Sequence, residues 1–325
     1  MPPTPGTSLK SVRRMPAPKI LSRIGGGNLT RDLDLAQDEL VALLELTQQV
    51  KAMPARFAQS LKGQYLSLLF EKPSLRTRLT FELAIKQLGG DSVLNTGVIG
   101  DREPLKDVAR NLDRWTNGIV ARTFSQETID ELAHWSAVPV INALSDRFHP
   151  CQALADIFTL KERFGDIRGL KLAFVGDGNN VANSLMLCAL RLGLNFSIAT
   201  PAGYQPDAEI VAQAEALAAV SGAKLAITND PSLAVEGAQA VYTDVWASMG
   251  QEHEQQKRRA DFAGFQVNRQ LLAQASGEAV FLHCLPAKRG QEVTDEVIES
   301  SQSVVFDQAE NRLHVQKALL LMLIS

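Results

Sequence analysis

The chain has 325 residues, of which 45% are hydrophobic, which suggests about two domains with sizeable cores. Its formal net charge of -3 argues against a general attraction to nucleic acid or to an anionic membrane surface. The three cysteines, Cys151, Cys188 and Cys284, form no Cys-x-x-Cys pair, which argues against a disulfide framework or a structural zinc site and fits a reducing compartment. No apolar run is long enough to span a bilayer.

Residues 1–27 are rich in Pro, Gly, Ser and Arg, contain no acidic residue and show no hydrophobic period. We therefore expect a disordered extension. A mitochondrial transit peptide is the alternative, because such segments are basic and poor in acids, although the prolines disfavour an amphipathic helix there. The spacing of the next apolar residues predicts a first amphipathic helix that contains Leu40, Leu43, Leu44, Thr47 and Val50.

A predicted buried strand at residues 65–70 leads into a predicted helix that ends at Gly89-Gly90. Pro73 disfavours helix at the residue before it, so we place the turn there and Ser74 at the N-cap. The helix N-terminus offers free N–H groups and the positive end of the dipole, and no acidic residue follows until Glu82. The sequence therefore predicts a site for a compact dianion such as phosphate, with a capped helix and solvated arginines as the plainer alternative. The cations and hydroxyls around this turn are Lys72, Ser74, Arg76, Thr77 and Arg78.

Short β-branched runs alternate with helical stretches along the rest of the chain, which predicts βαβ units and parallel sheets. Ligands bind beyond the carboxyl ends of the strands in such sheets, and Arg122 and His149 fall at such ends. Residues 250–259 are charged and rich in glutamine, as a mobile loop would be, and a final helix is expected from about Gln308 to Ile324. The predicted strands are 118–122, 138–142, 171–175, 195–199, 241–244 and 280–284.

Residues 171–180 resemble the first strand and turn of a dinucleotide-binding unit, so an oxidoreductase has to be weighed. The third glycine of that fingerprint is absent, with Ala182 nearby. The next strand ends in Thr200-Pro201 where an acidic residue would hold a ribose hydroxyl. We therefore expect no nicotinamide cofactor.

Five separate motifs carry the chemistry. In this order and spacing they resemble the carbamoyltransferases, specifically the ornithine carbamoyltransferases, and the resemblance runs from about residue 28 to the C-terminus. The motifs are Lys-Pro-Ser-Leu-Arg-Thr-Arg at 72–78, His-Pro-Cys-Gln at 149–152, Asp-Val-Trp-Ala-Ser-Met-Gly at 244–250, His-Cys-Leu-Pro at 283–286 and Glu-Asn-Arg at 310–312.

The resemblance implies an α/β fold with two doubly wound parallel-sheet domains of similar size, linked by helices. It implies a carbamoyl phosphate-binding domain at 28–155, an ornithine-binding domain at 156–308, and a C-terminal helix at 309–325 that packs back toward the first domain. It further implies a homotrimer, or a multiple of trimers, with sites near subunit boundaries and with neither a metal nor a cofactor. We expect a cytoplasmic protein, or a mitochondrial one if residues 1–27 are a transit peptide.

The implied reaction transfers the carbamoyl group of carbamoyl phosphate to the side-chain amine of L-ornithine, giving citrulline and phosphate, in arginine biosynthesis or breakdown. The resemblance assigns catalytic roles to Cys284, Arg122 and His149. Residues at carbamoyl phosphate-binding positions are Ser74, Leu75, Arg76, Thr77, Arg122, His149, Gln152, Cys284, Leu285 and Arg312. Residues at ornithine-binding positions are Asn180, Asp244, Ser248, Met249 and Cys284.

These residue types suit the chemistry. Arginines stabilise a developing oxyanion and hold phosphate in forked geometry. Asp244 offers a carboxylate to an α-ammonium group, and positioning two substrates supplies much of the acceleration. We also expect that Arg122 and Arg312 stabilise a Cys284 thiolate, which would hold the amine or take its proton.

Each residue alone has a plainer explanation: Cys284 as a small buried side chain, His149 as a cap and Arg122 as a surface ion pair. Three departures from the family pattern stand out. Leu75 occupies a position where threonine is commonest, Val98 one where many relatives carry glutamine, and Lys288 one where histidine is frequent. The alternatives are a carbamoyltransferase for N-acetylornithine, putrescine or aspartate, and a binding paralogue without turnover.

Overall fold

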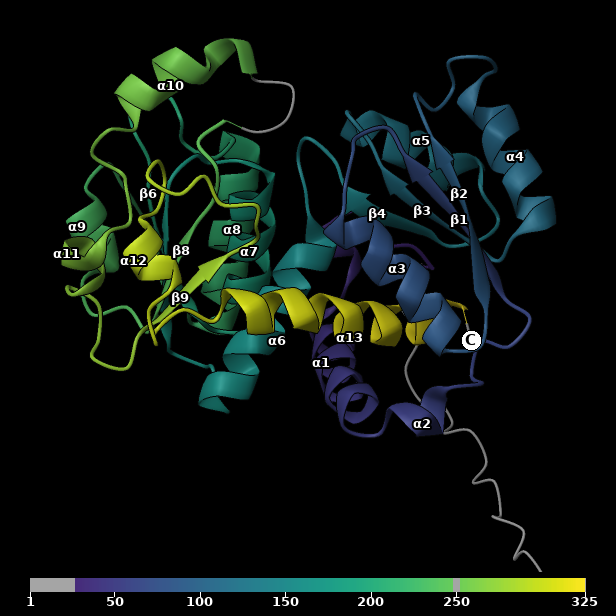
Figure 1. Ribbon diagram of the computed structural model, residues 1–325, viewed down its shortest axis with the longest axis horizontal. Coiled ribbons are helices and arrows are strands. Elements are labelled where there is room, and N and C mark those ends of the chain that lie inside the picture. Colours follow the sequence, from purple (N-terminus) through teal and green to yellow (C-terminus); the bar gives the residue numbers. More distant parts are fainter. Residues whose placement is uncertain (1–26, 248–251, 325) are drawn as a thin grey trace, which may run out of the picture.

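The computed structural model describes residues 27–247 and 252–324, which form two α/β domains that lie side by side (Figure 1). Each domain is built around a parallel sheet that carries helices on both faces. The fold class expected from the sequence is confirmed. Apart from Gly27, the expected N-terminal extension lies outside the described residues, as do Ser248 and Met249.

The first sheet has the strand order β2-β1-β3-β4, and all its neighbouring strands are parallel. Leu66, Leu68 and Phe70 of β1 face one hydrophobic core, while Leu69 faces another. Both faces of the strand are therefore covered, which explains why its sequence is apolar at almost every position rather than alternating. The strands are β1 (Tyr65–Phe70), β2 (Asp91–Thr96), β3 (Gly118–Arg122) and β4 (Val140–Leu144).

The second sheet has the order β7-β6-β5-β8-β9 and is also parallel throughout. From β5 the chain builds outward through β6 and β7, and then crosses to the other side of β5 for β8 and β9. A ligand crevice forms where the strand order reverses in this way. The strands are β5 (Lys171–Val175), β6 (Asn195–Ala199), β7 (Leu225–Thr228), β8 (Ala240–Thr243) and β9 (Val280–His283).

The helices of the first domain precede residue 150 in the chain, and α6 leads into the second domain. Among the residues that the structure describes, no helix has the length and hydrophobicity that a membrane crossing would need. The helices are η1 (Asp32–Asp34), α1 (Gln37–Ala52), α2 (Pro54–Phe57), α3 (Arg76–Gln87), α4 (Leu105–Trp115), α5 (Gln126–Trp135), α6 (Pro150–Phe164), α7 (Asn180–Arg191), α8 (Ala208–Ser221), α9 (Pro231–Val235), η2 (Glu252–Glu254), α10 (Gln255–Asp261), α11 (Arg269–Leu272), α12 (Asp295–Ile298) and α13 (Val305–Ile324).

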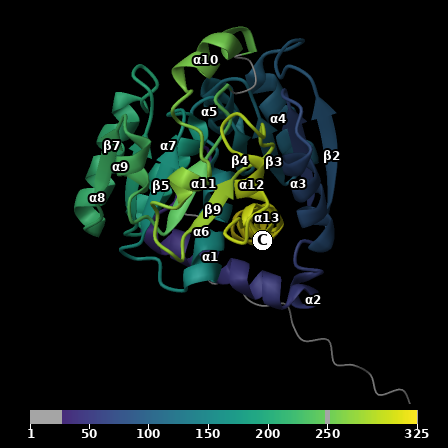
Figure 2. The same cartoon turned by 60° about the vertical axis from the view of Figure 1, so that its left-hand side comes forward.

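Two helices, α6 and α13, cross between the domains (Figure 1). Every residue of α6 from Pro150 to Leu160 is buried, and α13 packs against α1, α3, α6 and β9. Figure 2 views α13 nearly along its axis, enclosed by these elements. Because these helices are covered around most of their surface over the middle of their length, they lack the single apolar stripe of a surface helix. One continuous core, which includes Phe158 and Leu319, therefore joins both domains.

Several expected boundaries are shifted in the structure. Helix α3 begins at Arg76 with Leu75 as its N-cap, although the Ser74 hydroxyl still accepts the Thr77 N–H at 3.2 Å. The expectation of a mobile loop at 250–259 is wrong for its described part, because residues 252–261 form η2 and α10. The Glu254–Arg258 ion pair at 2.8 Å has the i,i+4 spacing that supports a helix.

Candidate active site

A cavity of 1620 Å³ lies between the two domains, at the carboxyl ends of strands from both sheets. The first domain contributes the turns after β1, β3 and β4, and the second domain those after β5, β6, β8 and β9. Arg312 reaches the cavity from α13. Every expected site residue that the structure describes lines this cavity, whereas Ser248 and Met249 lie outside the described residues.

The first-domain end of the cavity is rich in positive charge. Arg122 is 6% exposed, Arg312 is 2% exposed and Arg76 is half-buried. Burial and the neighbouring Arg312 lower the pKa of Arg122 to about 10, and burial lowers the pKa values of Arg312 and Arg76 as well. These shifts record that the three charges lie close together away from water.

These three arginines form no ion pair with a carboxylate among the residues that the structure describes. The buried Nε atoms of Arg122 and Arg312 also lack a hydrogen-bond partner there. Burying unpaired charge is costly, so this end of the cavity is suited to an anion that neutralises it. The N-terminus of α3 lies at the same place, with its backbone N–H groups and dipole adding to the attraction.

A buried hydrogen-bond chain orients the groups behind the arginines. Arg312 donates to Thr77 Oγ1 at 2.9 Å and, through its other terminal nitrogen, to Gln152 Oε1. Gln152 Nε2 donates to Asp156 Oδ1 at 2.8 Å, and Gln308 Nε2 donates to the same oxygen at 2.7 Å. Burial raises the pKa of Asp156 to about 7. Sequence reasoning missed Asp156 and Gln308; the i,i+4 spacing of Gln152 and Asp156 on one helix was the available signal.

His149 is buried at the start of α6, beside the arginines. Burial, with the charges of Arg312 and Arg122, lowers its pKa well below the usual value. The imidazole is therefore neutral at physiological pH, and its Nδ1 has no partner among the described residues. A neutral imidazole donates one hydrogen bond, which suits a carbonyl oxygen held against the arginines.

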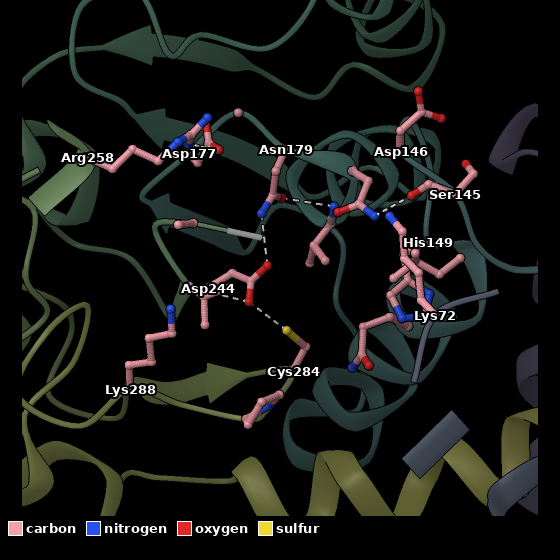
Figure 3. A pocket seen from close by; sticks show the side chains of 18 of the residues that line it. Lys72, Ser145, Asp146, His149, Asp177, Asn179, Asp244, Arg258, Cys284 and Lys288 are labelled. Atoms are coloured by element: carbon pink, nitrogen blue, oxygen red, sulfur yellow. Dashed lines mark hydrogen bonds and ion pairs between the residues drawn. The ribbon is translucent and has the colours of Figure 1, made fainter. Parts of the chain in front are cut away.

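The second-domain end of the cavity is organised around Asp244, which is 6% exposed. Its Oδ1 accepts the Cys284 thiol at 3.0 Å, and its Oδ2 accepts Asn179 Nδ2 at 2.9 Å (Figure 3). Asn180, the expected ligand, donates to the Ser145 carbonyl at 2.6 Å. Sequence reasoning therefore missed Asn179, whose N-cap position before α7 was its only signal.

The comparisons with known proteins agree with this geometry. Residues 28–162 match the family model for the carbamoyl-P binding domain of aspartate/ornithine carbamoyltransferase, and residues 168–323 match the model for its Asp/Orn binding domain. The chain belongs to the aspartate/ornithine carbamoyltransferase family.

Three relatives illustrate how closely this carbamoyltransferase chain follows the family. An ornithine carbamoyltransferase from Thermus thermophilus is 52% identical over 311 residues, which cover 93% of this chain and 100% of the relative. The solved ornithine carbamoyltransferase from Pyrococcus furiosus has a TM-score of 0.91 at 45% identity and covers 94% of this chain and 99% of its own. An acetylornithine transcarbamylase complexed with acetylcitrulline has a TM-score of 0.83 at 33% identity, with coverages of 92% and 99%.

The expectation that Cys284 is a thiolate is wrong. Burial and the carboxylate of Asp244 raise the pKa of this thiol well above its usual value. Cys284 donates a hydrogen bond to Asp244, so its nearest charged neighbour is an anion rather than Arg122 or Arg312. The sequence placed all these groups in one site but could not order them by distance.

Asp244, His283 and Cys284 also bring potential metal-binding atoms within 4.8 Å of one another. The Cys284 thiol is bound to Asp244, while His283 faces Glu292 through Nε2 and accepts the Leu285 N–H through Nδ1. The three side chains are therefore already engaged with one another and with their neighbours. A zinc ion would have to break these hydrogen bonds before the three side chains could act as its ligands.

Gly178, in the partial dinucleotide motif, has a local packing explanation. A Cβ atom there would lie 2.3 Å from the backbone nitrogen of Pro206 and 2.5 Å from the carbonyl carbon of Gln205. Glycine at this position lets the turn after β5 pass against the segment after β6. Packing alone therefore explains this glycine, without a bound pyrophosphate.

Proposed function

We propose that this protein is an ornithine carbamoyltransferase, which transfers the carbamoyl group of carbamoyl phosphate to the side-chain amine of L-ornithine. The observation that carries the proposal is the polarity of the cavity. Buried arginines without carboxylate partners among the described residues lie at one end, and Asp244 lies at the other. Carbamoyl phosphate suits the first end and a diamino acid suits the second.

In the proposed reaction the neutral amine of ornithine attacks the carbonyl carbon of carbamoyl phosphate. A C–N bond forms, the C–O bond to phosphate breaks with its electron pair going to the phosphate oxygen, and the proton that the amine loses passes to the departing phosphate. Arg122, Arg312 and neutral His149 stabilise the oxyanion that develops on the carbonyl oxygen. Arg76 and the α3 N-terminus hold the departing phosphate as its charge grows.

We assign the α-ammonium group of ornithine to Asp244. The Cys284 thiol and the Val245 N–H donate to its Oδ1 and Asn179 donates to its Oδ2, whereas a carboxylate has about four acceptor positions. One position, on Oδ2, therefore remains for an ammonium donor. The proposal keeps Asn180, Ser248 and Met249 as ornithine-binding positions and Ser74, Leu75, Thr77, Gln152 and Leu285 as carbamoyl phosphate-binding positions.

A homotrimer is part of the proposal, and the surface of α3 supports it. Leu75, Leu79 and Leu83 follow one another at four-residue spacing and are 70%, 43% and 45% exposed. They form a leucine row that starts at the edge of the cavity, and an exposed apolar row of this kind indicates a protein contact. Val93 and Val98, 64% and 62% exposed, lie on or next to the edge strand β2.

We further propose that residues 28–155 bind carbamoyl phosphate, that residues 156–308 bind ornithine, and that the C-terminal helix returns to the first domain. The activity would serve arginine biosynthesis or breakdown. Cys151, Cys188 and Cys284 are unpaired, which favours a reducing compartment such as the cytoplasm. A mitochondrial matrix location is the alternative that residues 1–27 leave open.

The test is a turnover assay with carbamoyl phosphate and a panel of amines. We expect equal amounts of citrulline and phosphate from L-ornithine, with far lower rates for N-acetylornithine and putrescine, because Asp244 suits an uncapped α-ammonium group. Equal rates for ornithine and putrescine would remove Asp244 from that role. Turnover of N-acetylornithine alone would assign the chain to the acetylornithine branch, and no turnover at all would favour a binding paralogue.

A further inference from the structure

Leu285 and Pro286 form part of the cavity wall. Their backbone lies at the end of β9, directly after Cys284. Proline has no N–H group, so Leu285 holds the one backbone donor of this pair. The partner of this N–H group determines whether the wall can donate a hydrogen bond to a ligand or can only accept one.

His283 occupies this donor. The Leu285 N–H donates to His283 Nδ1 at 2.9 Å, and Leu285 has a φ angle of 56°. This left-handed conformation is unfavourable for a branched side chain such as leucine, so the contact that accompanies it has a structural purpose. The remaining polar backbone groups of Leu285 and Pro286 are carbonyl oxygens, which only accept.

Glu292 and the Leu285 N–H together determine which ring nitrogen of His283 carries the proton. His283 and Glu292 are both fully buried, and His283 Nε2 lies 3.2 Å from Glu292 Oε1. Because Nδ1 accepts the Leu285 N–H, a neutral ring carries its proton on Nε2, facing the carboxyl group. The same Glu292 oxygen accepts the Lys288 N–H, which holds the loop after Pro286 in place.

We propose that His283 is a positioning residue that withdraws the Leu285 N–H from the cavity and leaves a wall of hydrogen-bond acceptors there. Such a wall selects ligands that carry N–H groups at this point, first the amide of carbamoyl phosphate and then the amine of the second substrate. An acyl phosphate with a methyl group in place of the amide would leave the carbonyls unpaired, which is costly in a buried site. The inference rests on the proposed function for its substrates.

The test compares variants of His283 that each keep one ring position. His283→Asn places an amide oxygen where Nδ1 lies, His283→Gln places an amide nitrogen near Nε2, and His283→Leu keeps neither. The measured quantity is selectivity, the inhibition constant of acetyl phosphate divided by the Km of carbamoyl phosphate. We expect the selectivity of His283→Asn to stay within about threefold of the wild type. The selectivity of His283→Gln and His283→Leu should fall roughly tenfold, which corresponds to the loss of about one hydrogen bond.

A role limited to packing against Glu292 predicts the reverse order, with His283→Gln closer to the wild type than His283→Asn. That order, or unchanged selectivity in all three variants, would overturn the proposal. Thermal unfolding of each variant separates loss of fold from loss of selectivity. If no variant folds, the wild-type protein still provides a test. Binding of acetyl phosphate as tight as that of carbamoyl phosphate would refute the proposal. Since selectivity concerns the acyl phosphate alone, failure of ornithine turnover refutes the proposed function separately.

Discussion

Three guanidinium groups decide what can occupy the first-domain end of the cavity. Arg76, Arg122 and Arg312 come from α3, β3 and α13, so their encounter depends on tertiary packing rather than on any one motif. Their mutual repulsion lowers the stability of the empty site, and a bound dianion removes it. Ligand binding and stabilisation of the protein are therefore linked here.

Arg76 offers the most direct mutational test of this anion site. Arg76→Ala should raise the Km for carbamoyl phosphate roughly 10- to 100-fold, because a charge-assisted hydrogen bond contributes about 1.5–3 kcal/mol. The matched control is Arg78→Ala, since Arg78 is exposed and pairs with Glu82 at 2.9 Å. Steady-state kinetics should place the control within twofold of the wild type. Equal effects of both substitutions would mean that the turn before α3 only caps the helix and does not bind the phosphate.

The protonation state of Cys284 gives a second prediction. Burial and Asp244 hold its pKa well above the usual range, so the thiol stays neutral across physiological pH. Cys284→Ser keeps a hydroxyl donor for Asp244 and should retain the pH profile of kcat/KM for ornithine. Cys284→Val removes the donor and should lower kcat/KM roughly tenfold, since one hydrogen bond is lost. A pH profile displaced by a full unit in Cys284→Ser would restore the thiolate mechanism.

At the scale of elements, η1 ties the start of the first domain to α7 of the second. Asp32 in η1 accepts the Ser184 hydroxyl at 2.5 Å and the Cys188 thiol at 3.4 Å. Both donors lie on α7, which is buried along most of its length. Burial raises the pKa of Asp32 from 3.8 to about 6. This carboxylate makes the contact between the domains sensitive to pH.

The direction of that sensitivity follows from the shift. Because the pKa of Asp32 is higher in the folded state, folding binds protons, and this group's contribution to stability falls as pH rises from 3.8 to about 6. The free energy of unfolding of Asp32→Asn minus that of the wild type should therefore increase by roughly 2 kcal/mol between pH 4 and pH 7. Denaturant titrations at both pH values measure it. A difference that does not change with pH would mean that Asp32 ionises normally.

Elements with a strong local signal could be predicted from the sequence, and contacts between distant elements could not. The runs at 65–70, 118–122, 171–175 and 195–199 are strands with the expected bounds, because successive residues on both faces of each strand are buried and most of them are apolar. Residues 250–259 were expected in a mobile loop, whereas residues 252–261 form η2 and α10, because a polar helix on the surface has no apolar period to mark it.

The site followed the same rule. The motifs pointed to residues that line the cavity, because most of them stand in a recognisable turn after a strand, whereas Arg312 lies within α13. Asp156, Gln308 and Glu292 support those residues from behind and belong to none of the motifs. Their roles arise from hydrogen bonds between positions up to 152 residues apart, which one sequence does not reveal.

For the whole molecule, the leucine row on α3 should form the subunit interface. Leu79→Lys with Leu83→Lys should convert the proposed homotrimer to monomers in sedimentation velocity, because leucines buried in an interface contribute about 1.5–3 kcal/mol each and a buried unpaired lysine is costly. Activity should fall together with the trimer, since the row begins at the edge of the cavity. Val220→Lys is the control, because Val220 is 82% exposed on α8 of the other domain. A variant that remains trimeric would place the interface elsewhere.

The central claim is that one cavity between the domains holds carbamoyl phosphate and ornithine at the same time. A phosphonate that joins an acyl group to the side-chain amine of L-ornithine tests it in a single calorimetric titration. We expect one molecule bound per chain, with an affinity well above that of phosphate or ornithine alone, since linking makes the second contact intramolecular. Arg76→Ala and Asp244→Asn should each weaken it. Binding no tighter than that of phosphate alone, or unaffected by Asp244→Asn, would contradict the account.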